Sequence, residues 1–382
     1  MPVLELPAVS ALLPARLQAP ARIEELDMLR GFLLLWMTLT HLPTRLSAYS
    51  NQAIGYVSAA EGFVFMAALL TGQVHRRATE KYGSETAFRN LLRRAWRIYR
   101  YHAVLLAMTF TIGAAAALQF HRTALANLMD FYLQHPKPAI VLGLTLVYDP
   151  PLLDILPIYI IFTLLTPVLL WGARRFGWTA VLGGSTVIWL LAQFGLRLRF
   201  YALLNAHGFP LPANEAGAFD LFAWQLLWAI GLWLGTAVAR ERLSERRLSR
   251  SLLAASALIA VTLFICRHTL HPGPLVDKWH LGIVRLIDLA AIGILLIRWG
   301  PRLARTRWAA RLAPLGRSSL EVFSLHVLCC LAALGLTTAA DPSFPWWQDM
   351  LLLGITFTGL FWIGYRTPSR FSVPPRRPQP AA

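Results

Sequence analysis

Long apolar runs separated by short polar links dominate this chain. Most of the runs approach the roughly 20 residues that a helix needs to cross the hydrocarbon core of a bilayer. The pattern predicts an all-α polytopic membrane protein with ten helices, at about 32–46, 54–74, 101–120, 154–173, 177–196, 219–239, 251–266, 281–298, 318–338 and 347–365.

Basic residues in the links predict how these helices are oriented across the membrane. The segment 76–100 alone contains eight Lys or Arg, and such clusters mark cytoplasmic links. Both ends are then cytoplasmic, and the single membrane domain, 22–366, lies between the tails 1–21 and 367–382. We expect periplasmic links at 47–53, 121–153, 197–217 and 267–280. The apolar run in 137–154 is too short to span and fits a re-entrant or interfacial segment.

Composition supports this class of protein. Hydrophobic residues make up 56% of the 382 residues and charged residues only 14%, against about 25% in soluble domains. The net charge of +17 does not indicate a nucleic-acid-binding face, because the basic residues are confined to short links, where anionic lipids also attract them. Three cysteines, Cys266, Cys329 and Cys330, lie in apolar runs and give neither a disulfide framework nor metal-ligand spacing.

Two ionisable residues interrupt the first two apolar runs. His41 lies near the far end of the first run and Glu61 near the start of the second, so an antiparallel helix pair would bring them to similar depth. Burying a charge there costs roughly 2.5–3.5 kcal/mol, so such residues need a reason to be present. A His beside a carboxylate suits general-base catalysis, but a packing histidine and a structural contact explain the same residues. Arg30 shares the helix face of His41, about 16 Å away at 1.5 Å per residue.

The segment 22–77 contains the motifs LDMLRG, THLP and YVSAAEGFVF. These motifs closely resemble the opening of the OpgC family, and the resemblance extends over most of the chain. That family consists of inner-membrane acyltransferases associated with succinylation of osmoregulated periplasmic glucans. The resemblance implies an acyl-CoA donor, succinyl transfer to glucan hydroxyls, His41 as general base and Glu61 as its supporting acid.

A cluster of basic and aromatic residues precedes the third apolar run. Guanidinium groups grouped on a helix bind phosphates well, although plain cytoplasmic charge explains each arginine alone. The family has a similar R-x-x-R…Y-x-x-H pattern. We therefore expect a binding site for the phosphates of acyl-CoA that includes Arg30, Arg93, Arg94, Arg97, Tyr99 and His102.

Polar residues near the predicted periplasmic side are candidates for binding the acceptor or the acyl group. Asp154 and Tyr159 lie at the start of one helix, where Asp154 fits glucan binding and helix capping equally. The group Asp220, Trp224 and Gln225 suits sugar binding, while tryptophan is also ordinary at a membrane interface. The remaining substrate candidate, Asp27, lies beside Arg30 at the mouth of the first helix.

Three further ionisable residues have competing interpretations. Lys278 and Arg285 are seven residues apart, which would place them on one stripe of a helix. Both suit the carboxylate of a succinyl group or an anionic glucan. For Arg285, a buried ion pair with Asp288 three residues on is the stronger interpretation. For His326, a satisfied core histidine is favoured.

The rival function is transport. Intramembrane His and Glu also form proton relays, so His41 and Glu61 would suit a proton-coupled transporter or a glycan flippase. No inverted repeat or matched pair of interrupted helices is evident in the sequence. The cluster of arginines also has no clear use in a simple carrier.

Overall fold

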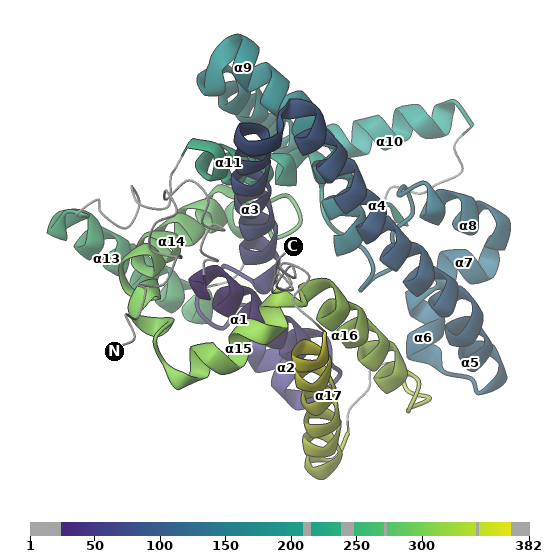
Figure 1. The fold of residues 1–382 in the computed structure, drawn as a ribbon. Coiled ribbons are helices and arrows are strands. Elements are labelled where there is room, and N and C mark those ends of the chain that lie inside the picture. The colour runs from purple at the N-terminus through teal and green to yellow at the C-terminus, as the bar shows by residue number, and fades with distance from the viewer. Residues whose placement is uncertain (1–23, 209–214, 238–247, 271–272, 341–343, 368–382) are drawn as a thin grey trace, which may run out of the picture.

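The computed structural model describes residues 24–208, 215–237, 248–270, 273–340 and 344–367. All regular secondary structure in these residues is helical, which confirms the predicted all-α class (Figure 1). The two predicted tails lie outside the described residues, apart from residue 367.

The apolar runs form the long helices. These are α1 (Glu24–His41), α3 (Ala59–Tyr82), α4 (Ser84–Met108), α9 (Ile155–Gln193), α11 (Leu221–Ala237), α13 (Arg250–Thr269), α14 (Ile283–Leu303), α16 (Ser319–Leu334) and α17 (Trp346–Arg366). Short helices connect them: α2 (Arg45–Ser50), η3 (Thr109–Gly113), α5 (Ala114–Gln119), α6 (Thr123–Leu128), α7 (Asp130–Gln134), α8 (Pro136–Leu144), α10 (Leu196–Ala206), η5 (Pro274–Val276) and α15 (Arg307–Arg317).

Helix α9 contains both of the helices predicted at 154–173 and 177–196. Its backbone leaves the helical conformation at Gly177, where φ is 83°. On either side of this break, Thr166 accepts a hydrogen bond from Trp228 (3.0 Å) and Ser185 accepts one from Gln225 (2.8 Å). Since those partners are neighbours on α11, the two legs of α9 fold back on each other at Gly177.

The basic segment after α3 is helical, although the sequence predicted a link at 76–100. Helix α3 continues to Tyr82, and α4 begins at Ser84, directly after Gly83 with φ 85°. Helix α4 buries Leu91, Ala95 and Ile98 at helical spacing while many charged residues face outward. The prediction was wrong because an amphipathic helix accepts dense positive charge on one face.

Two other links also contain helices. The basic segment before the run at 318–338 forms α15, which meets α16 at a bend of 84°. The segment expected to re-enter the membrane contains α8, a helix of nine residues that is too short to span.

Three helical segments in the described ranges are long and apolar enough to cross a membrane, Ser84–Gln119, Ile155–Gln193 and Arg250–Thr269. The bent pair α15–α16 would make a fourth. This is fewer than the ten spans predicted, because several of the other helices are short or contain ionisable residues, as α14 does with Arg285, Asp288 and Arg298. Large apolar side chains such as Trp171, Leu258 and Val261 are exposed on the outer helices, as in a membrane protein.

Close helix crossings position α1 and α3. A side chain at Gly31 or Gly316 would overlap the backbone of the opposite helix where α1 crosses α15. Gly72 of α3 and Gly235 of α11 are similarly confined. Small residues of this kind let membrane helices approach closely. As a result α1, α3, α11 and α15 surround the middle of the molecule, with α16 and α17 below and α4 to one side (Figure 1).

Candidate active site

His41 is the last residue of α1 and lines a cavity of about 520 Å³. Pro43 follows two residues later and cannot continue a helix, so the helix ends with the imidazole at the cavity wall. The other lining residues come from the end of α1, the link between α2 and α3, the end of α13 and the segment that leads from α13 to α14: Thr40, Asn51, Gln52, Tyr56, Arg267, Leu270, Val276, Asp277, Lys278 and Trp279.

The link between η5 and α14 holds Lys278 at this cavity. Its backbone is anchored by side chains of α9 and α11, because Trp224 donates to the carbonyl of Trp279 (3.0 Å) and Trp189 donates to that of Leu281 (2.9 Å). Asp277 is bonded to His280 in the same link. Burial alone would raise the pKa of Asp277, but the hydrogen bond from His280 outweighs it and lowers that pKa. These contacts fix the position of the lysine.

The ammonium of Lys278 lies 4.8 Å from the centre of the Trp279 ring. Burial lowers the pKa of Lys278, while the carboxylates of Glu61 and Asp154 act in the opposite direction. No hydrogen bond or ion pair joins its ammonium to another side chain in the part of the chain that the structure describes. A half-buried cation without a bonded counter-charge favours an anionic ligand.

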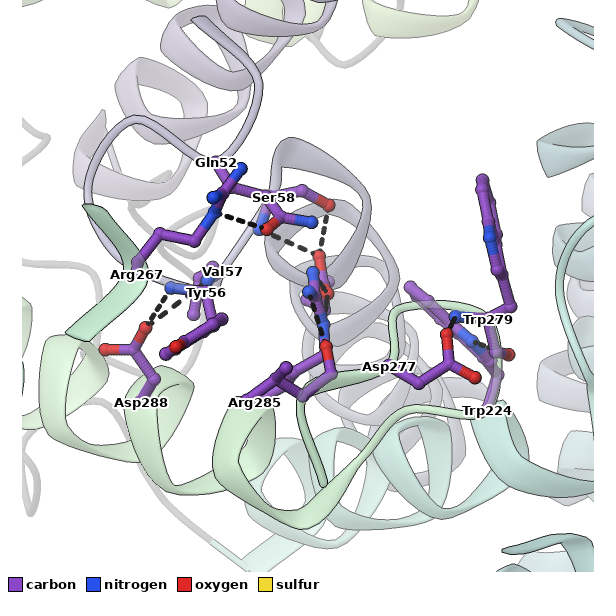
Figure 2. Close-up of polar contacts among 12 residues, drawn as sticks. Gln52, Tyr56, Val57, Ser58, Trp224, Arg267, Asp277, Trp279, Arg285 and Asp288 are labelled. Carbon is purple, nitrogen blue, oxygen red and sulfur yellow. Dashed lines mark hydrogen bonds and ion pairs between the residues drawn. The ribbon is translucent and has the colours of Figure 1, made fainter. Parts of the chain in front are cut away.

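Arg267 is the second cation of the cavity wall. Its Nε donates to the amide oxygen of Gln52 at 2.9 Å (Figure 2). Neither Arg267 nor Gln52 was anticipated from the sequence. Arg267 is the first residue of the predicted periplasmic link 267–280, where it looks like an ordinary helix-end charge, and only the fold brings it to the cavity.

Glu61 does not pair with His41, in contrast to the prediction. One carboxylate oxygen accepts from Nε of Arg285 at 2.6 Å and also from its terminal nitrogen. The other oxygen accepts from the backbone N–H of Ser58 at 3.0 Å and from the Ser58 hydroxyl, which forms a capping box at the start of α3. These bonds occupy both carboxylate oxygens. Glu61 therefore caps the start of α3 and pairs with Arg285.

Arg285 does not pair with Asp288, although the sequence favoured that pair. Asp288 instead accepts from the backbone N–H groups of Tyr56 (2.7 Å) and Val57 (3.3 Å) (Figure 2). Gly55 precedes them with φ 129°, and a side chain there would strike the Asp288 carboxylate. Arg285 and Asp288 thus fasten α14 to the link between α2 and α3.

The ring of His41 contacts a second histidine. Its Nδ1 lies 3.3 Å from Nε2 of His326 on α16, and Nδ1 of His326 lies 3.7 Å from Sγ of Cys330. His326 is buried, as a core histidine would be, but it lies against His41 rather than in apolar packing alone. The sequence signal was the same as for His41, an imidazole within an apolar run.

Part of the predicted donor site assembles near the other end of α1. Arg30 is bonded to Ser319 and lies 3.7 Å from Asp27, while Arg94 donates to Thr71 at 2.6 Å. Arg30 and Arg94 are close enough to Tyr159 to interact electrostatically. The Tyr159 hydroxyl is buried without a hydrogen-bond partner among the described residues. Tyr159 therefore lies with the arginines, away from the acceptor-binding position predicted for it.

The remaining donor candidates separate. Arg97 forms an ion pair of 2.5 Å with Glu321, but Arg93 is exposed and bonded to Asn90. Tyr99 donates to the carbonyl of Leu144 (3.0 Å), and His102 lies 3.1 Å from that of Gly143. Tyr99 and His102 thus hold α8 against α4.

The predicted acceptor residues have mainly supporting contacts. Asp220 accepts from the backbone N–H of Phe222 at the start of α11, and Trp224 and Gln225 are buried and hydrogen-bonded to neighbouring backbone carbonyls. Asp154, just before α9, has its pKa raised to about 6 by burial, an effect that Lys278 opposes. Of these residues, Asp154 is the one that interacts electrostatically with Lys278 of the cavity wall.

A comparison with protein families identifies the chain. A family model described as OpgC protein matches residues 22–368. The chain belongs to the OpgC family. At the level of that family, this indicates a glucan-modifying acyltransferase that uses an acyl donor, and it does not favour the transport alternative. Comparison with curated proteins and with solved structures gives no match.

Proposed function

We propose that this OpgC-family protein is a multi-pass O-acyltransferase of the bacterial inner membrane. It transfers an acyl group, succinyl in our proposal, from cytoplasmic acyl-CoA to hydroxyl groups of periplasmic glucans. The observation that carries the proposal is the cavity of about 520 Å³ in which His41 is faced by the cation Lys278. A base and a nearby cation are what transfer of a carboxylate-bearing acyl group requires.

The donor would enter from the arginine end of α1. In our proposal Arg30, Arg94 and Arg97 bind its phosphates, Tyr159 supplies a hydroxyl donor, and Asp27 holds Arg30 in place. Tyr99 and His102 shape this site through α8, while Arg93 contributes only general positive charge. The acyl arm would follow α1 to His41, over the roughly 16 Å that eleven residues of helix span.

Catalysis would take place in the cavity at His41. Unprotonated His41 removes the proton of a glucan hydroxyl as its oxygen attacks the thioester carbonyl. The tetrahedral intermediate then expels the CoA thiolate, which takes the same proton from His41. The ester is left on the glucan, and the enzyme returns to its starting protonation state. Glu61 contributes through its pair with Arg285, which supports the link that presents Lys278.

The acceptor would reach His41 from the opposite side. Asp154 and Asp220 lie at helix starts near the link of Lys278 and would bind glucan hydroxyls, with Trp224 and Gln225 supporting them. Lys278 binds the free carboxylate of the acyl group.

The proposed topology has ten spans with both ends in the cytoplasm. The two legs of α9 count separately, and the other spans are α1, α3, α4, α11, α13, α14, α16 and α17. Alternation of the basic clusters supports it, since the residues after α3 and after α14 are rich in Arg and face the same side in this arrangement. The tails 1–21 and 367–382 would flank a single membrane domain.

Mass spectrometry of periplasmic glucans tests the function. We compare cells with the wild-type protein, His41→Ala or no copy, after immunoblotting the membranes for equal protein. We expect a succinyl mass increment only with the wild type. Normal decoration by His41→Ala contradicts the role of His41 as base. Identical glucans in all three strains contradict the proposed acceptor.

A further inference from the structure

We infer that His326 is the positioning residue that fixes the tautomer and orientation of His41, the role assigned to Glu61 from the sequence. The inference rests on the proposed function, because it assumes that His41 is the base. Its evidence is the juxtaposition of His41, His326 and Cys330 at the end of α1 and along α16.

Glu61 is fully engaged elsewhere. Its two oxygens accept hydrogen bonds from Arg285 and from Ser58, and the side chains of Glu61 and Arg285 are both inaccessible to solvent. Turning the carboxylate toward His41 would leave the buried guanidinium without its counter-charge, which is strongly destabilising. A different group must therefore orient the imidazole.

The contacts between these side chains determine which ring nitrogen of each histidine carries a hydrogen. To accept a proton from an acceptor hydroxyl in the cavity, His41 must have Nε2 unprotonated and its hydrogen on Nδ1. That Nδ1–H then donates to Nε2 of His326, 3.3 Å away, so His326 must carry its own hydrogen on Nδ1. This hydrogen points to Sγ of Cys330 at 3.7 Å, a weak acceptor one helical turn on. The tautomers of both histidines are assigned from these bonds.

This arrangement gives His326 the orienting function of the acid in a catalytic triad, without a negative charge. The neutral imidazole holds the ring of His41 so that Nε2 faces the cavity. It also accepts a hydrogen bond from the imidazolium that forms after proton transfer. The cations Lys278 and Arg267 and the bonded Asp277 of the cavity wall complete the surroundings of His41.

Two nearly isosteric substitutions separate hydrogen bonding from packing. His326→Met fills the space but accepts no strong hydrogen bond, whereas His326→Gln provides an amide oxygen that can accept from Nδ1 of His41. Cys329→Ala is the matched control, since Cys329 lies beside Cys330 on α16 but interacts with Thr356. Purified, monodisperse variants are assayed with succinyl-CoA and glucans isolated from cells that lack the gene, and free CoA is quantified by chromatography.

We expect His326→Met to lower kcat by about 10²-fold or more, by analogy with loss of the orienting acid in a triad. KM for succinyl-CoA should change little, and His326→Gln should recover at least a tenth of wild-type kcat. The acid limb of the kcat/KM profile should move in His326→Gln relative to Cys329→Ala, because the partner of the base has changed.

Three outcomes would overturn the inference. If the Met and Gln variants are equally impaired, His326 only fills space. If His41→Ala is inactive while His326→Met keeps normal kcat and pH profile, the base is real but His326 does not position it. If His41→Ala is itself fully active, both the base and its positioning residue are excluded.

Discussion

Glu61 of α3 and Arg285 of α14 form an ion pair in which neither side chain is accessible to solvent. The pair joins helices that are far apart in sequence and lies close enough to Lys278 to act on its charge. It thereby connects the start of α3 to the link that lines the His41 cavity. Such a pair is expected to set geometry more than to add net stability.

Removing one partner of this pair should destabilise the protein strongly. Glu61→Ala leaves Arg285 buried and unpaired, and we expect a loss of about 3–5 kcal/mol. The double variant Glu61→Leu with Arg285→Met should recover much of this loss, because apolar side chains of similar size leave no buried charge. Thermal unfolding of the detergent-purified proteins measures the effect. Equal midpoints for Glu61→Ala and the wild type would contradict the buried pair.

The sequence predicts helices well here because helix formation depends on local pattern. The apolar runs and the break near Gly177 are readable from neighbouring residues. The basic part of α4 was misjudged because dense charge resembles a link when the buried positions between the charges are overlooked. The number of membrane-spanning helices is harder to predict, since buried ionisable residues lower the hydropathy of the helices that hold the site.

The contacts between site residues could not be predicted from local sequence pattern. His41 meets His326 across 285 positions, and Glu61 meets Arg285 across 224. A single sequence indicates that each of these residues needs a partner, but several partners satisfy that need equally. Only helix packing decides between them. The hairpin of α1 and α3 was a reasonable expectation, yet the capping box at Ser58 turns Glu61 to its own helix start.

Arg94 and Arg93 provide a matched test of the donor site. Arg94 points inward to Thr71 near Arg30, while its neighbour Arg93 is exposed. We expect Arg94→Ala to raise KM for succinyl-CoA by about tenfold or more, since charge-assisted hydrogen bonds contribute roughly 1.5–3 kcal/mol. Arg93→Ala should change it less than about twofold, the effect of an exposed charge. Steady-state kinetics at fixed ionic strength decide the point, and equal effects would indicate general charge attraction instead of a bound phosphate.

Lys278 should determine the preference for acyl groups that carry a carboxylate. We expect Lys278→Met to lower kcat/KM for succinyl-CoA by about 10- to 100-fold, the loss of one buried charged hydrogen bond, and to leave acetyl-CoA nearly unaffected. Lys278→Arg keeps the charge and should retain most of the preference. Competition between the two donors, read by mass spectrometry of the product, measures it. A parallel loss with both donors would assign Lys278 to the acceptor or to the fold.

This preference should also depend on pH. Burial lowers the pKa of Lys278 from its ordinary value of 10.5, so the ammonium loses its proton below that pH. The preference for succinyl over acetyl should therefore decline as pH rises, with the midpoint of the decline below pH 10.5. The Lys278→Arg variant should keep its preference over that range, because arginine stays protonated. A preference that is constant with pH in the wild type would contradict this assignment.

Asp154 gives a prediction in which stability and activity move in opposite directions. Burial raises its pKa from 3.8 to about 6, so the folded state holds this proton more tightly than the unfolded state. Between these two values the unfolded state binds fewer protons, and the stability contributed by Asp154 falls as pH rises. Asp154→Asn should remove that fall and be more stable than the wild type at pH 7, by on the order of 1–3 kcal/mol.

Comparing the unfolding midpoints of Asp154→Asn and the wild type at pH 4 and pH 7 measures this effect together with the relief of Asp149, whose pKa the Asp154 carboxylate helps to raise. The difference should be small at pH 4 and larger at pH 7. If Asp154 also binds a glucan hydroxyl as a carboxylate, the more stable variant should show a raised KM for the glucan acceptor. An unchanged KM would restrict Asp154 to its place beside Lys278, and a variant less stable than the wild type at pH 7 would contradict the raised pKa.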